Sequence, residues 1–257
     1  MFFYSMAAAN MFVVLKTRSS YRLLIISDYT AMDLLNKMEI LRQLPLLDCL
    51  DNNELERLAS MASLRRTTKY AFVFMPDEPA DQLFLLVEGR IKIGTFSQDG
   101  REVIKDILHP QTLFGDLALA GELRHSEFAQ ALHDGAVCLS IGLSGFHALM
   151  QQNQRLVFAC LQHLTSRLQR VEDRLAKLVL KDARERIIEF LVDTAGKEGR
   201  RVGYETLVKH HLTQQDIANL TGTSRQTVTS VMNDLRKSNL IYFNRKSILI
   251  RDIERLA

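Results

Sequence analysis

The chain has 257 residues, of which 47% are hydrophobic and 25% are charged, and its formal net charge at pH 7 is +3. This length is sufficient for two domains, each with a hydrophobic core. The small net charge excludes a uniformly basic nucleic-acid-binding chain, so any affinity for DNA has to come from locally clustered cations.

The cysteines are few and scattered. Cys49, Cys138 and Cys160 stand far apart, and the sequence holds no Cys-x-x-Cys pair and no His/Cys cluster at zinc-binding spacing. This pattern predicts free, buried thiols in a reducing compartment and no metal site. We therefore expect a cytoplasmic protein without structural disulfides.

Residues 1–31 are an N-terminal extension of unknown role. The apolar run Met1–Leu15 is shorter than the ~20 residues of a membrane-spanning helix, and no basic residue precedes it as in a signal peptide. We interpret the segment as a disordered extension or an upstream translation start, with the natural beginning near Met32 or Met38. A weak amphipathic membrane anchor is the alternative, but no membrane partner is expected.

Residues 32–152 carry the pattern of a sensor domain. The spacing of apolar residues is helical from residue 32 to 64, with Pro45 as a break and with Asp51 and Glu54 as a capping box. From residue 67 to 143, short apolar runs alternate with polar or glycine turns, which is typical of an antiparallel barrel or roll. The expected strands include 70–74, 83–87, 90–96, 128–132 and 137–141.

Residues 153–182, the larger part of a helical stretch from 145 to 182, are the expected dimerisation helix. Its apolar residues advance by alternating steps of four and three, as in a coiled-coil seam of about three heptads. The seam consists of Val157, Leu161, Leu164, Leu168, Val171, Leu175 and Leu178, and it is flanked by Arg167, Arg170, Glu172, Arg174 and Lys177. So narrow a stripe predicts a parallel homodimer. Phe158 and Cys160 lie off the seam and are candidates for packing on the roll.

Residues 183–257 have the pattern of a winged helix domain. Thr213 and Asp216 form a capping box, and Gly222 suits a turn that needs a positive φ. Ser224 caps a second helix, Ser224–Arg236, whose outer face is polar. A β-hairpin follows, with cations at its tip. The residues expected to contact DNA are Thr213, Gln214, Ser224, Arg225, Gln226, Thr227, Thr229, Ser230 and Asn233 in the helices, and Arg245 and Lys246 in the hairpin.

Several strings in this order resemble the cyclic-AMP receptor protein/fumarate-nitrate regulator (CRP/FNR) family of bacterial transcription factors. They are LVEGRIKI at 86–93, DGRE at 99–102, FGDLAL at 114–119, LTQQDIANLTGTSRQTV at 212–228 and the hairpin at 240–252. The resemblance runs from about Met38 to the end of the chain. It implies an α+β protein with an N-terminal antiparallel β-roll of the cyclic-nucleotide-binding jelly-roll type, a long dimerisation helix and a C-terminal winged helix-turn-helix. It also implies RNA polymerase as a partner of the DNA-bound protein.

The same resemblance indicates how DNA would be read. The second helices of two winged domains would enter successive major grooves of a near-palindromic double-stranded site. Arg225 would bond a guanine, and Gln226 would read the neighbouring base. Many relatives have glutamate in place of Gln226, and the arginine that some carry one turn later is Ser230 here. The target sequence therefore differs from that of the best-known members.

The resemblance places effector-binding residues at Phe114, Gly115, Asp116, Leu117, Arg124, His125 and Ser126. The family's nucleotide-binding pattern has glutamate in place of Asp116 and an arginine in place of His125. Glu127 stands beside the phosphate position, and a carboxylate repels an anion. A cyclic nucleotide is therefore not expected as effector, unless a shift of one residue brings Arg124 to the phosphate. The sequence also lacks the N-terminal cysteine cluster of an iron–sulfur sensor, and the effector remains unknown.

The leading hypothesis is a homodimeric transcription regulator that performs no chemistry. The sequence holds no paired nucleophile and base and no phosphate-binding glycine string, so no enzymatic activity is expected. A constitutive regulator whose roll is only a scaffold stays open. The alternative from another class is a cyclic-nucleotide-binding module that acts on a protein partner, which leaves residues 213–252 without a use.

Overall fold

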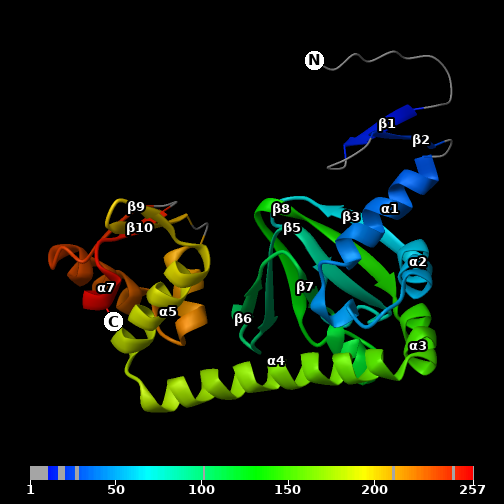
Figure 1. The fold of residues 1–257 in the computed structure, drawn as a ribbon. Helices are drawn as coiled ribbons and strands as arrows, with labels where there is room; N and C mark the ends of the chain where they lie inside the picture. The colour runs from blue at the N-terminus through cyan, green and yellow to red at the C-terminus, as the bar shows by residue number, and fades with distance from the viewer. Residues whose placement is uncertain are drawn as a thin grey trace.

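The computed structural model describes residues 11–16, 21–26, 29–100, 102–209, 212–244 and 247–256 (Figure 1). Strands β1 (Met11–Lys16) and β2 (Tyr21–Ile26) pair antiparallel, from Met11 opposite Ile26 to Lys16 opposite Tyr21. The extension of unknown role therefore contains a two-stranded antiparallel pairing in these two segments. Both are short apolar runs, and each meets the backbone hydrogen-bonding needs of the other.

Three short helical elements precede the roll. They are α1 (Tyr29–Leu41), the 3₁₀ turn η1 (Pro45–Leu47) and α2 (Asn52–Met61). Pro45 opens the 3₁₀ turn, and the capping box of Asp51 and Glu54 is present, as expected. The helical pattern was expected to reach residue 64, but the chain leaves α2 at Met61 and enters β3 (Ala62–Thr67). Pairing of β3 with a long strand of the roll outweighs the local helical preference.

The roll is an antiparallel sheet curled on itself. Its main strand order is β3-β8-β5-β6, with β4 paired to β8 and β7 paired to β5. The strands are β4 (Phe72–Phe74), β5 (Gln82–Phe96), β6 (Glu102–Leu108), β7 (Thr112–Phe114) and β8 (Phe128–Gly142), and η2 (Asp116–Ala120) follows β7. Buried apolar side chains, including Phe74, Phe84 and Phe114, fill its interior.

Two glycines let the long strands β5 and β8 bend together without ending. Runs 83–87 and 90–96 were expected as separate strands, as were 128–132 and 137–141, but each pair is one strand. Gly89 and Gly135 have φ of 83° and 74°, and the β5–β8 register shifts around Gly89. A Cβ on Gly89 would lie 2.2 Å from the carbonyl oxygen of Gly135, so both the conformation and the close approach require glycine.

Helices α3 and α4 lie between the roll and the winged domain, and Asn153 between them is the N-cap of α4. After α3 (Leu143–Gln152), the Asn153 side chain accepts hydrogen bonds from the backbone amides of Arg155 and Leu156 and starts the 27-residue α4 (Gln154–Leu180). The domain contains α5 (Ala183–Glu198), β9 (Arg200–Val202), β10 (Glu205–Lys209), α6 (Gln214–Thr221), α7 (Arg225–Lys237), β11 (Ile241–Phe243), β12 (Ser247–Ile250) and α8 (Ile253–Leu256). Its sheet has the order β11-β12-β10-β9.

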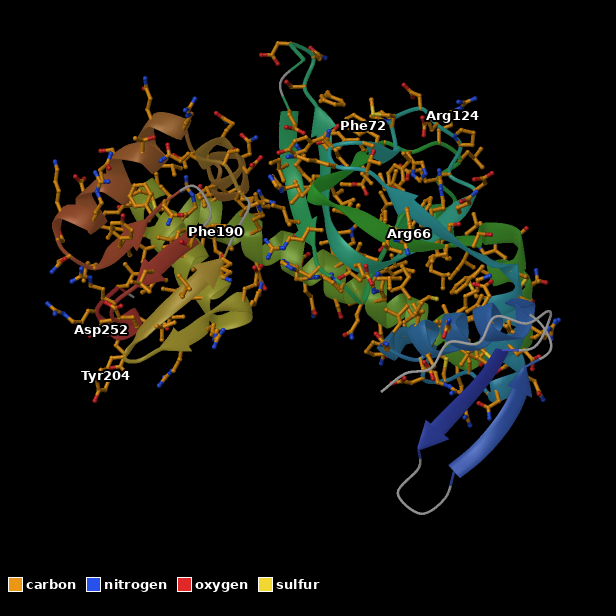
Figure 2. All side chains as sticks on the ribbon, turned by 90° about the horizontal axis from the view of Figure 1, so that it is seen from above. Arg66, Phe72, Arg124, Phe190, Tyr204 and Asp252 are labelled. Carbon is orange, nitrogen blue, oxygen red and sulfur yellow. The ribbon has the colours of Figure 1, made fainter. Side chains whose placement is uncertain are left out.

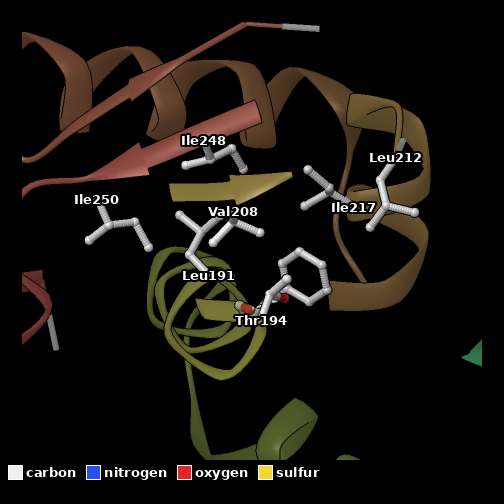
Figure 3. Close-up of a pocket in the computed structure, with 8 residues that line it drawn as sticks. Leu191, Thr194, Val208, Leu212, Ile217, Ile248 and Ile250 are labelled. Carbon is white, nitrogen blue, oxygen red and sulfur yellow. Dashed lines mark hydrogen bonds between the residues drawn. The ribbon is translucent and has the colours of Figure 1, made fainter. Parts of the chain in front are cut away.

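The core of the winged domain contains a small cavity. Figure 3 shows a small cavity between α5, α6 and the sheet, lined by Leu191, Thr194, Val208, Ile217 and other apolar residues. Its volume of about 10 Å³ is at the lower limit for one water molecule, and its apolar lining offers a water few partners. The cavity is a packing defect of the core.

Helix α4 runs along the roll and ends beside the winged domain (Figure 1). Near its C-terminal end, Arg174 contacts both bodies. Its Nη1 donates to the carbonyl of Lys105 in β6, while Nη2 donates to the carbonyls of Asn219 and Leu220 at the end of α6, at 3.2 and 2.9 Å. Arg174 therefore joins the roll, the long helix and the helix-turn-helix through one guanidinium.

Other contacts strengthen this junction. Arg186 of α5 donates to the carbonyls of Thr221 and Gly222, at 2.8 and 3.1 Å. Glu198 at the end of α5 pairs with Arg90 of β5 at 2.6 Å and lies 3.3 Å from His109. Burial lowers the pKa of His109, which favours its neutral form.

Within the described residues, no helix is both long and apolar enough to cross a lipid bilayer. The same part of the chain brings no group of three or more His, Cys, Asp or Glu side chains into position to hold a metal ion. Its three cysteines are all free thiols; Cys138 and Cys160 are buried, and burial raises their pKa values to about 12 and about 11.

Replacement of Gly89 by alanine is expected to destabilise the roll. The left-handed conformation costs alanine about 1–2 kcal/mol, and the clash with the Gly135 carbonyl adds an overpacking cost of about 1–3 kcal/mol. The matched control is Gly100→Ala, because Gly100 has φ of 77° but no atom within 4 Å of the added Cβ. Urea denaturation measures both variants, and equal losses would refute the close-approach argument.

The variant Arg174→Gln is expected to loosen the winged domain from the roll without unfolding either. Loss of the guanidinium leaves the carbonyls at the end of α6 and in β6 without their shared donor, so amide exchange should rise at least tenfold in residues 102–108 and 219–222. Hydrogen-exchange mass spectrometry makes the measurement. Arg170→Gln is the control, because the Arg170 side chain bonds only to the Ser166 carbonyl of its own helix among the described residues. Identical exchange in the two variants would contradict the assigned role.

Candidate DNA-binding face and sensor site

The helix-turn-helix is built by local hydrogen bonds. The Thr213 side chain accepts from the Asp216 amide while the Asp216 carboxylate accepts from the Thr213 amide, which confirms the expected capping box. Ser224 caps α7 by accepting from the Thr227 amide at 3.0 Å. Gly222 ends α6 with φ of 62°, and a Cβ there would lie 2.5 Å from Leu178 of α4. These caps fix the angle between α6 and α7.

The outer face of α7 is open and polar. Arg225, Gln226, Thr229, Ser230 and Asn233 line a shallow groove on this face. Among the described residues, the Arg225 guanidinium has no hydrogen-bond or ion-pair partner. The opposite face, with Val228, Val231, Met232 and Leu235, is buried in the winged domain. The side chains offered to solvent are of the kinds that bond base edges and phosphates.

The other predicted DNA contacts lie in the helix caps and in the wing. Thr213, Ser224 and Thr227 take part in the helix caps, and Gln214 accepts a hydrogen bond from the Thr229 hydroxyl at 2.7 Å, so it positions a residue of the open face. Arg245 and Lys246, the predicted cations of the hairpin, lie outside the described residues. The strands on either side of them, β11 and β12, pair antiparallel as the wing requires.

Helix α4 presents the predicted seam to solvent. Six of the seven seam residues are 41–62% exposed, and Leu164 is half-buried. The exposed six are Val157, Leu161, Leu168, Val171, Leu175 and Leu178. Of the two off-seam candidates for packing on the roll, Cys160 is buried against it, but Phe158 is 66% exposed, so that expectation is wrong for Phe158.

The other side of α4 contributes side chains to the predicted effector site. The sequence analysis did not predict this contribution. Arg167 pairs with Asp116 and with Glu127, to which its Nη2 lies 3.3 Å away. His163 Nε2 lies 2.9 Å from the second oxygen of Asp116. Asp116 and Glu127 are almost fully buried. Arg167 was expected only as a charge beside the seam, and the signal that could have found it is its spacing from Cys160 and Arg174, which places all three on one side of the helix.

The remaining predicted effector residues differ in burial, and not all of them lie near this cluster. Phe114 and Gly115 are buried beside Asp116, and Leu117 is half-buried. His125 is buried and stacks on Phe74, with ring centroids 3.7 Å apart. Arg124 lies at the periphery of the roll (Figure 2), where it donates to the Asp77 carbonyl at 2.5 Å. In this position the Arg124 side chain is exposed and lies away from the interior of the roll.

Comparison with known proteins gives two family matches in the order seen here. The model of the cyclic nucleotide-binding domain matches residues 64–153, and the model of the Crp-like helix-turn-helix domain matches residues 185–257. A module that acts only on a protein partner does not account for the second match.

Relatives and solved structures agree with these matches. A CRP-like cAMP-activated global transcriptional regulator of Mycobacterium tuberculosis is 32% identical over 185 residues, which are 72% of this chain and 82% of that protein. The anaerobic regulatory protein of Bacillus subtilis is 26% identical over 204 residues, 79% of this chain and 85% of its own. FixK2 from Bradyrhizobium japonicum has the same fold, with a TM-score of 0.67 and 21% identity over 76% of this chain and 95% of that one.

The Mycobacterium tuberculosis relative is a transcriptional regulator, and the two family matches cover both the roll and the helix-turn-helix of this chain. Together with the open polar face of α7, these matches show that the chain belongs to the CRP/FNR family of transcription regulators, whose members bind DNA.

Proposed function

We propose that the protein is a homodimer that binds a near-palindromic promoter site through two copies of α7. The observation that carries this proposal is the exposed seam of α4. Six leucine and valine residues, 41–62% exposed, lie along one side of a 27-residue helix, at the spacing by which two helices pack knobs into holes. A second copy of the same stripe is the partner of matching shape, and a twofold axis is the usual symmetry of such pairs.

The dimer determines what DNA it reads. A parallel pair of α4 helices carries the two winged domains at one end, so two α7 helices face the same side of the assembly. Helices that enter successive major grooves contact half-sites about 34 Å apart, and twofold symmetry of the protein calls for an inverted repeat.

Readout is proposed to start from Arg225. Its guanidinium stands at the first turn of α7, exposed and without a partner among the described residues, so it loses no protein contact on binding guanine through two hydrogen bonds. Gln226, Ser230 and Asn233 are placed for neighbouring bases or phosphates. Arg245 and Lys246 of the wing would bind the backbone beside the groove.

Two further elements complete the proposed setting. RNA polymerase is the protein partner expected of a promoter-bound regulator, and the cytoplasm is the compartment that fits DNA binding and three free cysteine thiols. The roll and α4 would set the spacing of the two α7 helices through the contacts of Arg174 and Leu178.

Arg225→Ala is expected to reduce sequence discrimination strongly. Loss of one bidentate base contact costs about 1–3 kcal/mol per half-site, so the preference for the cognate site over random DNA should fall at least tenfold. Lys246→Ala is the contrast, because a phosphate contact should weaken all DNA equally and reduce the salt dependence of binding. Fluorescence anisotropy measures both, on a site selected from random oligonucleotides. Unchanged discrimination in Arg225→Ala would show that α7 does not read bases as proposed.

Leu168→Glu is expected to give a monomer, because a twofold axis places two like charges in the centre of an apolar seam. Light scattering after gel filtration measures the mass, and DNA affinity for the full site should fall at least a hundredfold. The matched control is Gln169→Glu, which adds the same charge one residue further along α4, at an exposed position off the seam. A dimer of Leu168→Glu that binds DNA normally would rule out this interface.

A further inference from the structure

Asp116 and Glu127 form a buried ion cluster at the place where the resemblance to the family implies an effector. Asp116 Oδ1 forms an ion pair with Arg167 Nη1, and Asp116 Oδ2 lies 2.9 Å from His163 Nε2. Arg167 and His163 both belong to α4. Glu127 Oε1 lies 3.3 Å from Arg167, and Oε2 lies 3.2 Å from Lys105 of β6. All four carboxylate oxygens therefore have a cation or an imidazole of this chain as a partner.

The cluster is balanced without a ligand. Two carboxylates face the guanidinium of Arg167 and the ammonium of Lys105, and an N–H on His163 Nε2 suffices to donate to Asp116. An entering phosphate would add a negative charge beside two buried carboxylates and would have to compete with them for Arg167.

The amide and side chains that the resemblance places around a cyclic phosphate are bonded to other groups or carry no charge. The Ser126 amide donates to a Glu122 carboxylate oxygen at 3.1 Å, which places another anion at the loop. Burial lowers the pKa of His125, so its ring is neutral near pH 7 and offers no charge in place of the family's arginine. Arg124 bonds the Asp77 carbonyl at the outside of the roll. The residues present do not fit a cyclic nucleotide.

We propose that Arg167 takes the place of an effector: it ties α4 to the roll permanently, so DNA binding needs no cyclic nucleotide. The part of this inference that concerns DNA binding rests on the proposed function. Arg167 and Arg174 lie two turns apart on the roll-facing side of α4, and Arg174 contacts α6. The tie at Arg167 therefore fixes where Arg174 meets the helix-turn-helix.

The first test measures nucleotide binding by calorimetry without DNA, and then the effect of each nucleotide on DNA affinity. Calorimetry of the full chain with cyclic AMP and with cyclic GMP, each at up to 1 mM, should show no binding heat, and either nucleotide should change DNA affinity less than twofold. Micromolar binding of one of them, or DNA binding only in its presence, would overturn the proposal. Failure to bind DNA under any condition would instead contradict the proposed function, while the calorimetry still decides on the ligand.

The second test removes the tie. Arg167→Gln should lower DNA affinity at least tenfold and raise amide exchange in residues 160–175, with the dimer retained. Arg170→Gln, on the same helix but outside the cluster, should change neither. If the single variant fails to fold, the double variant Glu127→Gln with Arg167→Gln is used in its place. It removes one charge of each sign and so leaves the net charge of the buried cluster unchanged. Wild-type DNA affinity and exchange in the folded variant would refute the role of Arg167.

Discussion

The structure depends on α4, which contacts the roll and the winged domain with one side and exposes an apolar stripe on another. Positions spaced by three and four residues return to one side of a helix, and stripes offset by one residue lie about 100° apart. The stripe that contains Cys160, Arg167 and Arg174 contacts the roll, and the stripe that begins at Val157 is exposed. A rotation of α4 about its axis would change its contacts with the roll and the direction of the exposed stripe together, and would so couple the roll to the proposed dimer interface.

Features that rest on neighbouring residues were predictable from the sequence. The capping boxes at Asp51 and Thr213 are confirmed. They could be predicted because each side chain and its backbone partner lie only three residues apart. The long helix and its seam follow from the spacing of leucines alone. The partners of Arg167 and Arg174 were not predictable, because Asp116 is 51 residues and Lys105 69 residues distant along the chain. Only the fold brings these groups together, so a charge beside a seam and a charge inside a sensor look alike in sequence.

The boundaries within the roll were less predictable for a related reason. Glycine and polar residues between apolar runs normally indicate turns, yet Gly89 and Gly135 lie inside continuous strands. Their positive φ bends each strand, and the missing side chains let the two backbones approach. Likewise Ala62–Leu64 continue a helical pattern but pair with β8. In both cases, pairing with a distant strand determines the conformation.

The ion cluster in the roll contributes position more than stability. Burying Asp116 and Glu127 costs desolvation energy that Arg167 and Lys105 offset, and an apolar cluster of the same volume would often be as stable. Apolar side chains, however, tolerate a small slide of one surface over another, whereas hydrogen-bonded charges fix the register between them. Since Leu178 packs against Gly222 and Arg174 bonds the end of α6, the register set at Arg167 extends to the turn before α7. On the proposed role of Arg167, the roll would hold α4 in one register, and α4 would hold the turn before the DNA-binding helix.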